Sequence, residues 1–226
     1  MSTVRVPSTP RAAVATVVAL LVLAVIASAS VVVPARASSL PPYRSTMRTA
    51  TKADVALSWH PGCPVGPGSL RVLRLTYLGF DGRAHTGTLV VSAKVASDVR
   101  YAFRRLYEKR FPIRGMKRVD LYGGSDNRSM AADNTSAFNC RKAVQAGPAT
   151  WSNHAYGVAV DINPRENPYV LGGKVLPPAG SAYLNRSSKA KGVIHARGPV
   201  VGVFSSLGFR WGGVWSNPDY QHFDRK

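Results

Sequence analysis

Two histidines and one aspartate in the C-terminal half of the chain have the residue types of a metal site. His154 and Asp161 lie seven residues apart, and His222 lies four residues before the last residue. Two imidazoles and one carboxylate suit a zinc ion that keeps one position open for water. An open zinc site of this kind supports hydrolysis. The helical HExxH arrangement is absent, so these ligands must converge from separate elements.

The residues that follow the first histidine predict a tight turn that leads into a strand. Gly157 provides the turn, and Val158–Ile162 is rich in β-branched side chains. A helix would also bring positions seven apart to one face, but Gly157 and the β-branched run favour the strand. We expect a terminal strand that carries His222 to complete a site with three ligands.

The rest of the chain predicts an α+β fold, with a small, mostly antiparallel sheet flanked by helices. Residues 70–80 and 85–92 predict a β-hairpin around the turn signal Asp81-Gly82. A helix is expected from Ser97 or Asp98 to about Arg110. Further expected elements are a strand over 117–122, a helix over 199–207, strands over 209–211 and 220–223, and mostly irregular segments over 38–69, 123–153 and 172–192.

The chain is strongly basic, with 30 Lys and Arg against 11 Asp and Glu and a formal net charge of +19. One interpretation is a solvated basic surface. The other is attraction to a polyanion, because a net field concentrates oppositely charged partners. Nucleic acid, an anionic cell-wall polymer and a membrane surface are the candidate partners.

The first 37 residues indicate export. Arg5 and Arg11 precede an uncharged, mostly apolar stretch over 12–33, and Ala35-Arg36-Ala37 has the form cut by signal peptidase. We predict cleavage near Ala37–Ser38. The alternative is an uncleaved N-terminal membrane anchor, since the apolar stretch is long enough to span a bilayer. On either interpretation the folded part of the protein is exported, which makes genomic DNA an unsuitable partner. The sequence also contains no nucleic-acid-binding signature.

Two cysteines, Cys63 and Cys140, are the only ones in the chain. In an oxidising compartment a pair is typically a disulfide, and two unpaired thiols are the alternative. Neither cysteine has zinc-finger spacing, so a cysteine-ligated metal is not indicated.

Several blocks of sequence, in order, resemble the M15 family of zinc peptidases, which includes D-alanyl-D-alanine carboxypeptidases, dipeptidases and peptidoglycan endopeptidases. The family pattern SxHxxGxAxD, followed by an acid three residues before a final histidine, is matched over residues 152–161 and 219–222. The flanking blocks over 128–134, 136–141, 161–164 and 211–213 are similar as well. The resemblance covers about residues 68–226 and implies a DD-peptidase-like or hedgehog-like fold.

The resemblance implies that His154, Asp161 and His222 bind zinc and that Asp219 is the general base and acid. A carboxylate three residues from a ligand histidine can accept a proton from water and pass it to the leaving amine. Asp224 is the rival base, because on a regular strand it would share a face with His222, whereas Asp219 needs a turn or bulge. The carboxypeptidase and dipeptidase branch generally has Glu at position 219, and Asp resembles the branch that cuts the L-Ala–D-Glu bond.

A substrate carboxylate needs a cationic partner, and guanidinium suits it. The resemblance places the substrate arginine at Arg128, and Arg141 is the second choice. Ser152 could hydrogen-bond the substrate or orient a ligand.

These observations predict a signal peptide or anchor over 1–37, a linker and lead-in over 38–67, and a catalytic domain over 68–226. The expected activity is hydrolysis of an amide bond in peptidoglycan stem peptides, outside the cytoplasm. A catalytically silent wall-binding module on the same fold is the alternative.

Overall fold

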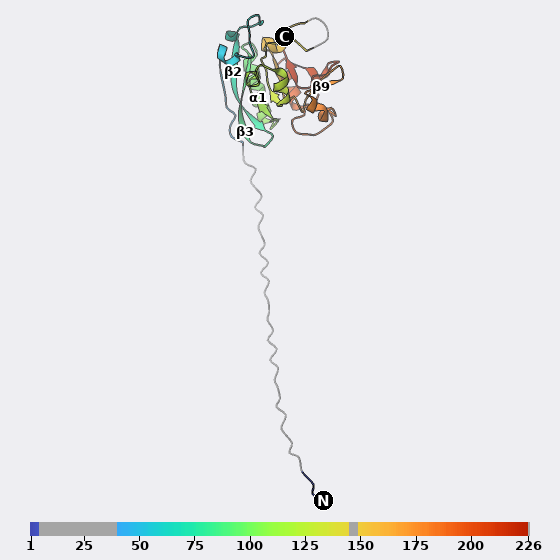
Figure 1. Cartoon of the computed structure of the whole chain (residues 1–226). Helices are drawn as coiled ribbons and strands as arrows, with labels where there is room; N and C mark the ends of the chain where they lie inside the picture. Colours follow the sequence, from blue (N-terminus) through green and yellow to red (C-terminus); the bar gives the residue numbers. More distant parts are fainter. Residues whose placement is uncertain (5–39, 145–148, 226) are drawn as a thin grey trace. The chain divides into compact units, whose positions relative to one another are not determined.

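The computed structural model describes residues 1–4, 40–144 and 149–225 (Figure 1). The chain divides into a unit over Met1–Ser38 and a compact unit over Ser39–Lys226. The expected signal peptide or anchor therefore lies outside the described residues, apart from its first four. Among the residues described, there is no helix with the length and apolar character needed to cross a bilayer.

The first layer is a sheet in which β2 (Leu70–Gly79) pairs antiparallel with β3 (Ala84–Ser92), which confirms the predicted hairpin. On its other edge β2 pairs with β1 (Ser45–Thr49) and, in parallel, with the short β4 (Pro112–Ile113). Apolar side chains from one face of this sheet form a core that continues into the second sheet.

Helix α1 (Ala96–Glu108) packs against β2 and confirms the predicted helix (Figure 1). Val99, Phe103 and Leu106 recur at helical spacing and are buried in the core. The expected cap at Ser97 or Asp98 is wrong, because the helix begins after Val95 without a side-chain cap. Asp98 instead accepts a hydrogen bond from Arg225 at 2.7 Å.

A second, three-stranded sheet has the order β10-β11-β7, with both pairs antiparallel. Helix α3 (Pro199–Ser206) lies against it, and the ring of Phe204 stacks on Phe223 with centroids 4.5 Å apart. The predicted final strands, the predicted helix and the strand that carries Asp161 are thus confirmed. The strands of this sheet are β7 (Ala159–Asp161), β10 (Arg210–Trp211) and β11 (His222–Asp224).

Four expectations are corrected. The strand expected over 117–122 is the 3-10 helix η3 (Val119–Tyr122), because Asp120 accepts hydrogen bonds from the backbone of Leu57 and Ser58. The loop expected over 123–153 contains helix α2 (Asp126–Ala131), and the linker expected over 38–69 contains β1. The loop expected over 172–192 contains a strand and a 3-10 helix.

The remaining elements are η1 (Lys52–Val55), η2 (Pro67–Ser69), β5 (Gly115–Met116), β6 (Asn134–Thr135), η4 (Asn153–Tyr156), β8 (Tyr169–Leu171), β9 (Lys174–Leu176), η5 (Pro178–Tyr183) and η6 (Gly212–Val214).

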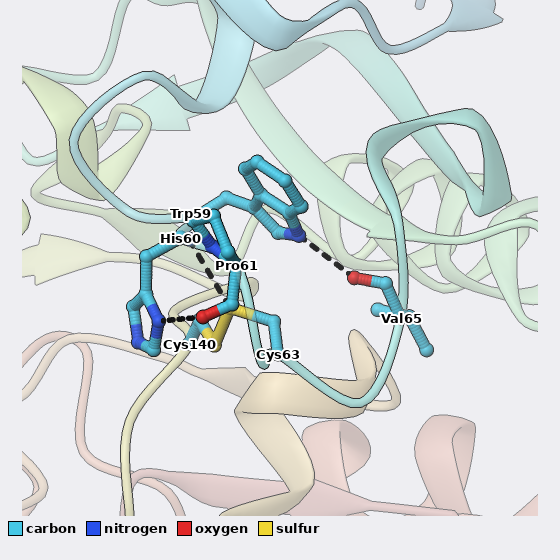
Figure 2. Close-up of a disulfide and its surroundings, with 6 residues drawn as sticks. All are labelled: Trp59, His60, Pro61, Cys63, Val65 and Cys140. Atoms are coloured by element: carbon cyan, nitrogen blue, oxygen red, sulfur yellow. Dashed lines mark hydrogen bonds between the residues drawn. A yellow bond between two sulfur atoms is a disulfide. The ribbon is translucent and has the colours of Figure 1, made fainter.

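Cys63 and Cys140 form the expected disulfide, which closes a separation of 77 residues (Figure 2). The bridge joins the segment before β2 to the chain that approaches the histidine turn. The backbone N–H of His60 points to Cys63 Sγ, and Trp59 Nε1 donates to the carbonyl of Val65 at 2.9 Å (Figure 2). This region has its own small core around Val55, Leu70 and Phe138.

Candidate metal centre

His154 is held by a short turn with a defined beginning and end. At the start of η4, Ser152 Oγ accepts a hydrogen bond from the backbone N–H of His154 at 3.2 Å. At the end, Gly157 has a φ of 69°, and a Cβ there would lie 2.7 Å from the backbone nitrogen of Ser92. Only glycine fits both requirements without strain. The sequence therefore fixes the position from which the imidazole extends.

The orientation of the His154 imidazole is also fixed, by a contact of one ring nitrogen with the backbone. Its Nδ1 lies within hydrogen-bonding distance of the backbone carbonyl of Ala137. Because a carbonyl can only accept, Nδ1 carries a proton, which leaves Nε2 as the nitrogen that a metal ion could bind. This is the form in which a histidine binds a metal through Nε2.

Asp161 and His222 are direct cross-strand partners in the pairing of β7 with β11. Opposite residues of an antiparallel pair project to the same face, so the sheet brings these two side chains together. His222 Nδ1 lies 3.0 Å from Asp161 Oδ1, and His154 Nε2 lies 3.1 Å from Asp161 Oδ2. The two histidine nitrogens, His154 Nε2 and His222 Nδ1, are 3.2 Å apart.

These three buried side chains offer their ligand atoms around a single point. Tetrahedral ligands about 2.0–2.1 Å from a zinc ion lie about 3.3 Å from one another, close to the separations found here. The donor set is also the one that zinc accepts. Within the described residues a second group, His60 with Cys63 and Cys140, has suitable atom types, but its sulfurs are joined in the disulfide and cannot serve as thiolate ligands.

Without a metal the cluster holds protons. Burial alone would raise the pKa of Asp161, but the charges and hydrogen bonds of His154 and His222 outweigh it and hold the pKa well below its usual range. Burial would lower the pKa of His222, but the carboxylates of Asp161 and Asp224 outweigh it and raise the pKa to about 10. A metal ion must therefore displace a proton from His222, which couples metal affinity to pH.

Asp219 reaches the same cleft through a turn. Its backbone N–H donates to the carbonyl of Gly212 at 3.0 Å, and its own carbonyl accepts from the N–H of His222 at 3.3 Å. This is the turn that the sequence argument required. Burial raises the pKa of its carboxyl to about 7; the charge of His222 opposes this increase and that of Asp161 adds to it. Its Oδ1 is buried and has no hydrogen-bond partner among the described residues.

Asp224 has different surroundings. Arg210 grips both oxygens of its carboxylate at 3.0 and 2.9 Å, and Asn153 Nδ2 donates to Oδ2. The same oxygen lies 3.6 Å from His222 Nε2, the imidazole nitrogen that does not face Asp161. Both oxygens of Asp224 are therefore already engaged by Arg210 and Asn153.

A cleft of about 550 Å³ opens over the three side chains and Asp219. Arg141 lines it, pairs with Asp126 at 2.8 Å, and lowers the pKa of Asp219 by its charge. Arg128 is not among the lining residues, because its guanidinium donates to the carbonyls of Tyr122 and Gly123 at the end of η3. Of the two expected arginines, the structure brings only Arg141 to the cleft.

Sequence reasoning missed several residues around the site. Asp126 as the partner of Arg141 was hidden in the expected loop, and the carbonyl of Ala137 carries no side-chain signal. Trp215, for which the sequence allows either a place in the cleft or packing in the core, lies beside His222, with ring centroids 5.3 Å apart, and lines the cleft.

Residues 146–225 match the family model described as D-alanyl-D-alanine carboxypeptidase, an M15 peptidase family. The matched region contains His154, Asp161, Asp219 and His222. The comparisons with curated proteins and with solved structures give no match.

Proposed function

We propose that this chain, whose residues 146–225 belong to the M15 peptidase family, is an exported zinc metallopeptidase that hydrolyses an amide bond in peptidoglycan stem peptides. The observation that carries the proposal is the convergence of His154 Nε2, His222 Nδ1 and the Asp161 carboxylate to within 3.0–3.2 Å of one another. Asp219 lines the cleft over them, and its buried Oδ1 has no hydrogen-bond partner among the described residues.

His154, Asp161 and His222 would hold the zinc ion, and the carbonyl of Ala137 and Asp224 would keep the two imidazoles oriented. When bound, zinc supplies a Lewis acid that polarises a carbonyl and brings the pKa of water toward about 7. The carboxylate of Asp219 accepts the proton of the attacking water and later passes it to the leaving amine. A pKa raised by burial suits both steps, since the group must gain and lose a proton near neutral pH.

Arg141 is the cationic group for a substrate carboxylate. It lines the cleft, and its buried Nε has no hydrogen-bond partner. Stem peptides carry both a terminal and a side-chain carboxylate, so this position is compatible with a D-Ala-D-Ala carboxypeptidase and with an L-Ala–D-Glu endopeptidase. The disulfide and the N-terminal pattern support an exported protein.

The proposal is tested by mass spectrometry of purified muropeptides after incubation with the zinc-loaded protein. We expect loss of one terminal D-Ala or a cut between L-Ala and D-Glu, abolished by a chelator and restored by zinc. His154→Ala should remove both bound zinc and cleavage, while the matched change His85→Ala, at an exposed histidine outside the cleft, should keep both. Wall binding by wild type without any cleavage would instead identify a silent binding module.

A further inference from the structure

A second, larger hollow of about 1040 Å³ lies on the molecule and shares no lining residue with the metal cleft. One wall is the segment over residues 40–46, and the other is the exposed side of α1 from Ser97 to Glu108, together with Arg110 just after the helix. We call it the arginine groove. Tyr107 donates to the carbonyl of Pro41 at 2.6 Å and Tyr43 to that of Arg100 at 3.1 Å, so both walls are fixed to each other.

The charge of the arginine groove is one-sided. Four arginines line it against a single carboxylate, that of Glu108. Glu108 is already occupied, because Arg104 and Arg105 bind its two oxygens at 2.8 and 2.6 Å. The lining arginines are Arg44, Arg100, Arg104 and Arg110.

Three of these four arginines have no acidic partner among the described residues. Arg100 donates only to the hydroxyl of Ser45, at 3.2–3.3 Å, and the guanidinium groups of Arg44 and Arg110 have no partner there. Uncompensated cations that face one hollow repel one another, and an anion in the hollow would remove that repulsion. The groove is therefore complementary to a negatively charged ligand.

The shape of the groove indicates a chain rather than a single ion or a flat surface. The lining part of α1, from Ser97 to Glu108, spans about 16 Å at about 1.5 Å per residue. Arg100 and Arg104 lie along it, and Arg110 lies just beyond its end. A membrane surface is disfavoured because the apolar face of α1 is buried in the core, and Tyr101 is the one large hydrophobic residue of this helix that is exposed.

The anion is best matched by phosphate. Arg44 approaches from one wall and Arg100 and Arg104 from the other. The oxygens of a phosphate point out of a single plane and can accept from guanidinium groups on both sides, whereas a carboxylate presents its two oxygens in one plane. We propose that the arginine groove binds a linear phosphodiester polyanion, separately from the metal cleft.

The test measures binding of soluble poly(glycerol phosphate) to the protein as recovered from the producing cell, by calorimetry at several salt concentrations. The groove variant combines Arg44→Gln, Arg100→Gln and Arg110→Gln. The matched control removes the same three charges at exposed positions elsewhere, Arg83→Gln, Lys189→Gln and Lys191→Gln. At about fivefold per basic residue, the groove variant should bind roughly 100-fold more weakly with a shallower salt dependence, and the control within about threefold of wild type.

Two further measurements make the outcome decisive. Arg44→Gln alone removes no side-chain hydrogen bond or ion pair among the described residues and should still weaken binding about fivefold, which excludes misfolding as the cause. Muropeptide cleavage should be unchanged in all groove variants, so the result is independent of the proposed peptidase activity. Equal losses in the groove and control variants would overturn the proposal, as would equally tight binding of poly-L-glutamate, or binding confined to anionic lipid vesicles.

Discussion

Two carboxylates of the site differ in what surrounds them, and under the proposed function this difference gives them separate tasks. Asp219 keeps a buried oxygen without a partner, while Asp224 is held by Arg210 and Asn153 and faces His222. A free carboxylate can exchange a proton with water. A carboxylate that is already fully hydrogen-bonded instead holds a ligand imidazole in place.

Asp219→Asn and Asp224→Asn should therefore fail in different ways. Asp219→Asn removes the proton acceptor, so kcat should fall by about 10²–10⁴ while the protein still binds one zinc ion. Asp224→Asn weakens the support of His222, so zinc affinity should fall by about 10–100-fold and activity should recover in excess zinc. Zinc content by mass spectrometry and kcat at saturating zinc separate the two. A reversed pattern would make Asp224 the base.

At this scale residue type and spacing indicated three side chains, His154, Asp161 and His222, that the structure brings together, and their binding of zinc stays a prediction. The sequence could not decide whether Arg128 or Arg141 lies at the cleft. Which arginine lines the cleft depends on how α2 and η3 fold, since Arg128 is used by the carbonyls of Tyr122 and Gly123. Nothing in the sequence distinguishes an arginine that binds these carbonyls from an ordinary surface arginine.

Among the elements, the turn at Gly157 connects the fold to the chemistry. It lies between His154 and β7, with a left-handed φ of 69° and the backbone of Ser92 too close for any side chain. Gly157→Ala should cost about 2 kcal/mol or more in the free energy of unfolding and should weaken zinc binding, because the turn must shift. Urea denaturation and zinc titration measure both.

A matched control is Gly66→Ala, where φ is −85° and no atom lies within 4 Å of the added Cβ. That variant should stay within about 0.5 kcal/mol of wild type. Equal stability of both variants would show that the turn at Gly157 yields easily and does not position His154.

The disulfide between Cys63 and Cys140 is the second feature that holds distant elements together. It closes a separation of 77 residues, and the chain-entropy model assigns about 4 kcal/mol to a loop of that length. Cys63→Ala with Cys140→Ala should lower the free energy of unfolding by roughly this amount, and a reductant should destabilise wild type but not the double variant. No change on reduction would mean that the small core around Val55 and Phe138 suffices.

Local pattern predicted the elements that carry strong periodicity, namely the β2–β3 hairpin, α1 and α3. It failed where tertiary contacts decide. The residues of β1 show no apolar alternation and form a strand only because β2 offers its backbone. The β-forming run at Val119–Tyr122 winds into a 3-10 helix because Asp120 binds the backbone of Leu57 and Ser58.

At the scale of the whole compact unit, two buried acidic residues from distant parts of the sequence, Asp133 and Glu166, lie close to the same arginine. Glu166 is fully buried after β7, and Asp133 lies before β6. The guanidinium of Arg114, after β4, lies 3.4 Å from the carboxylate of Asp133 and 3.3 Å from that of Glu166. Glu166 Oε2 has no hydrogen-bond partner. Burial, and next the neighbouring Asp133, raise the pKa of Glu166 to about 7, although Arg114 opposes the increase.

This pair makes stability depend on pH. The pKa of Glu166 is higher in the folded protein, about 7, than its ordinary value of 4.5, so the folded state holds the proton more tightly. The resulting stabilisation is complete below pH 4.5 and is lost as pH rises through 7, by up to about 3 kcal/mol. Glu166→Gln mimics the protonated form and should flatten the stability profile between pH 5 and 7.5 in urea denaturation. Glu108→Gln, at an exposed carboxyl on α1, should leave that slope unchanged. If Glu166→Gln kept the wild-type slope, another group would carry the pH dependence of the fold.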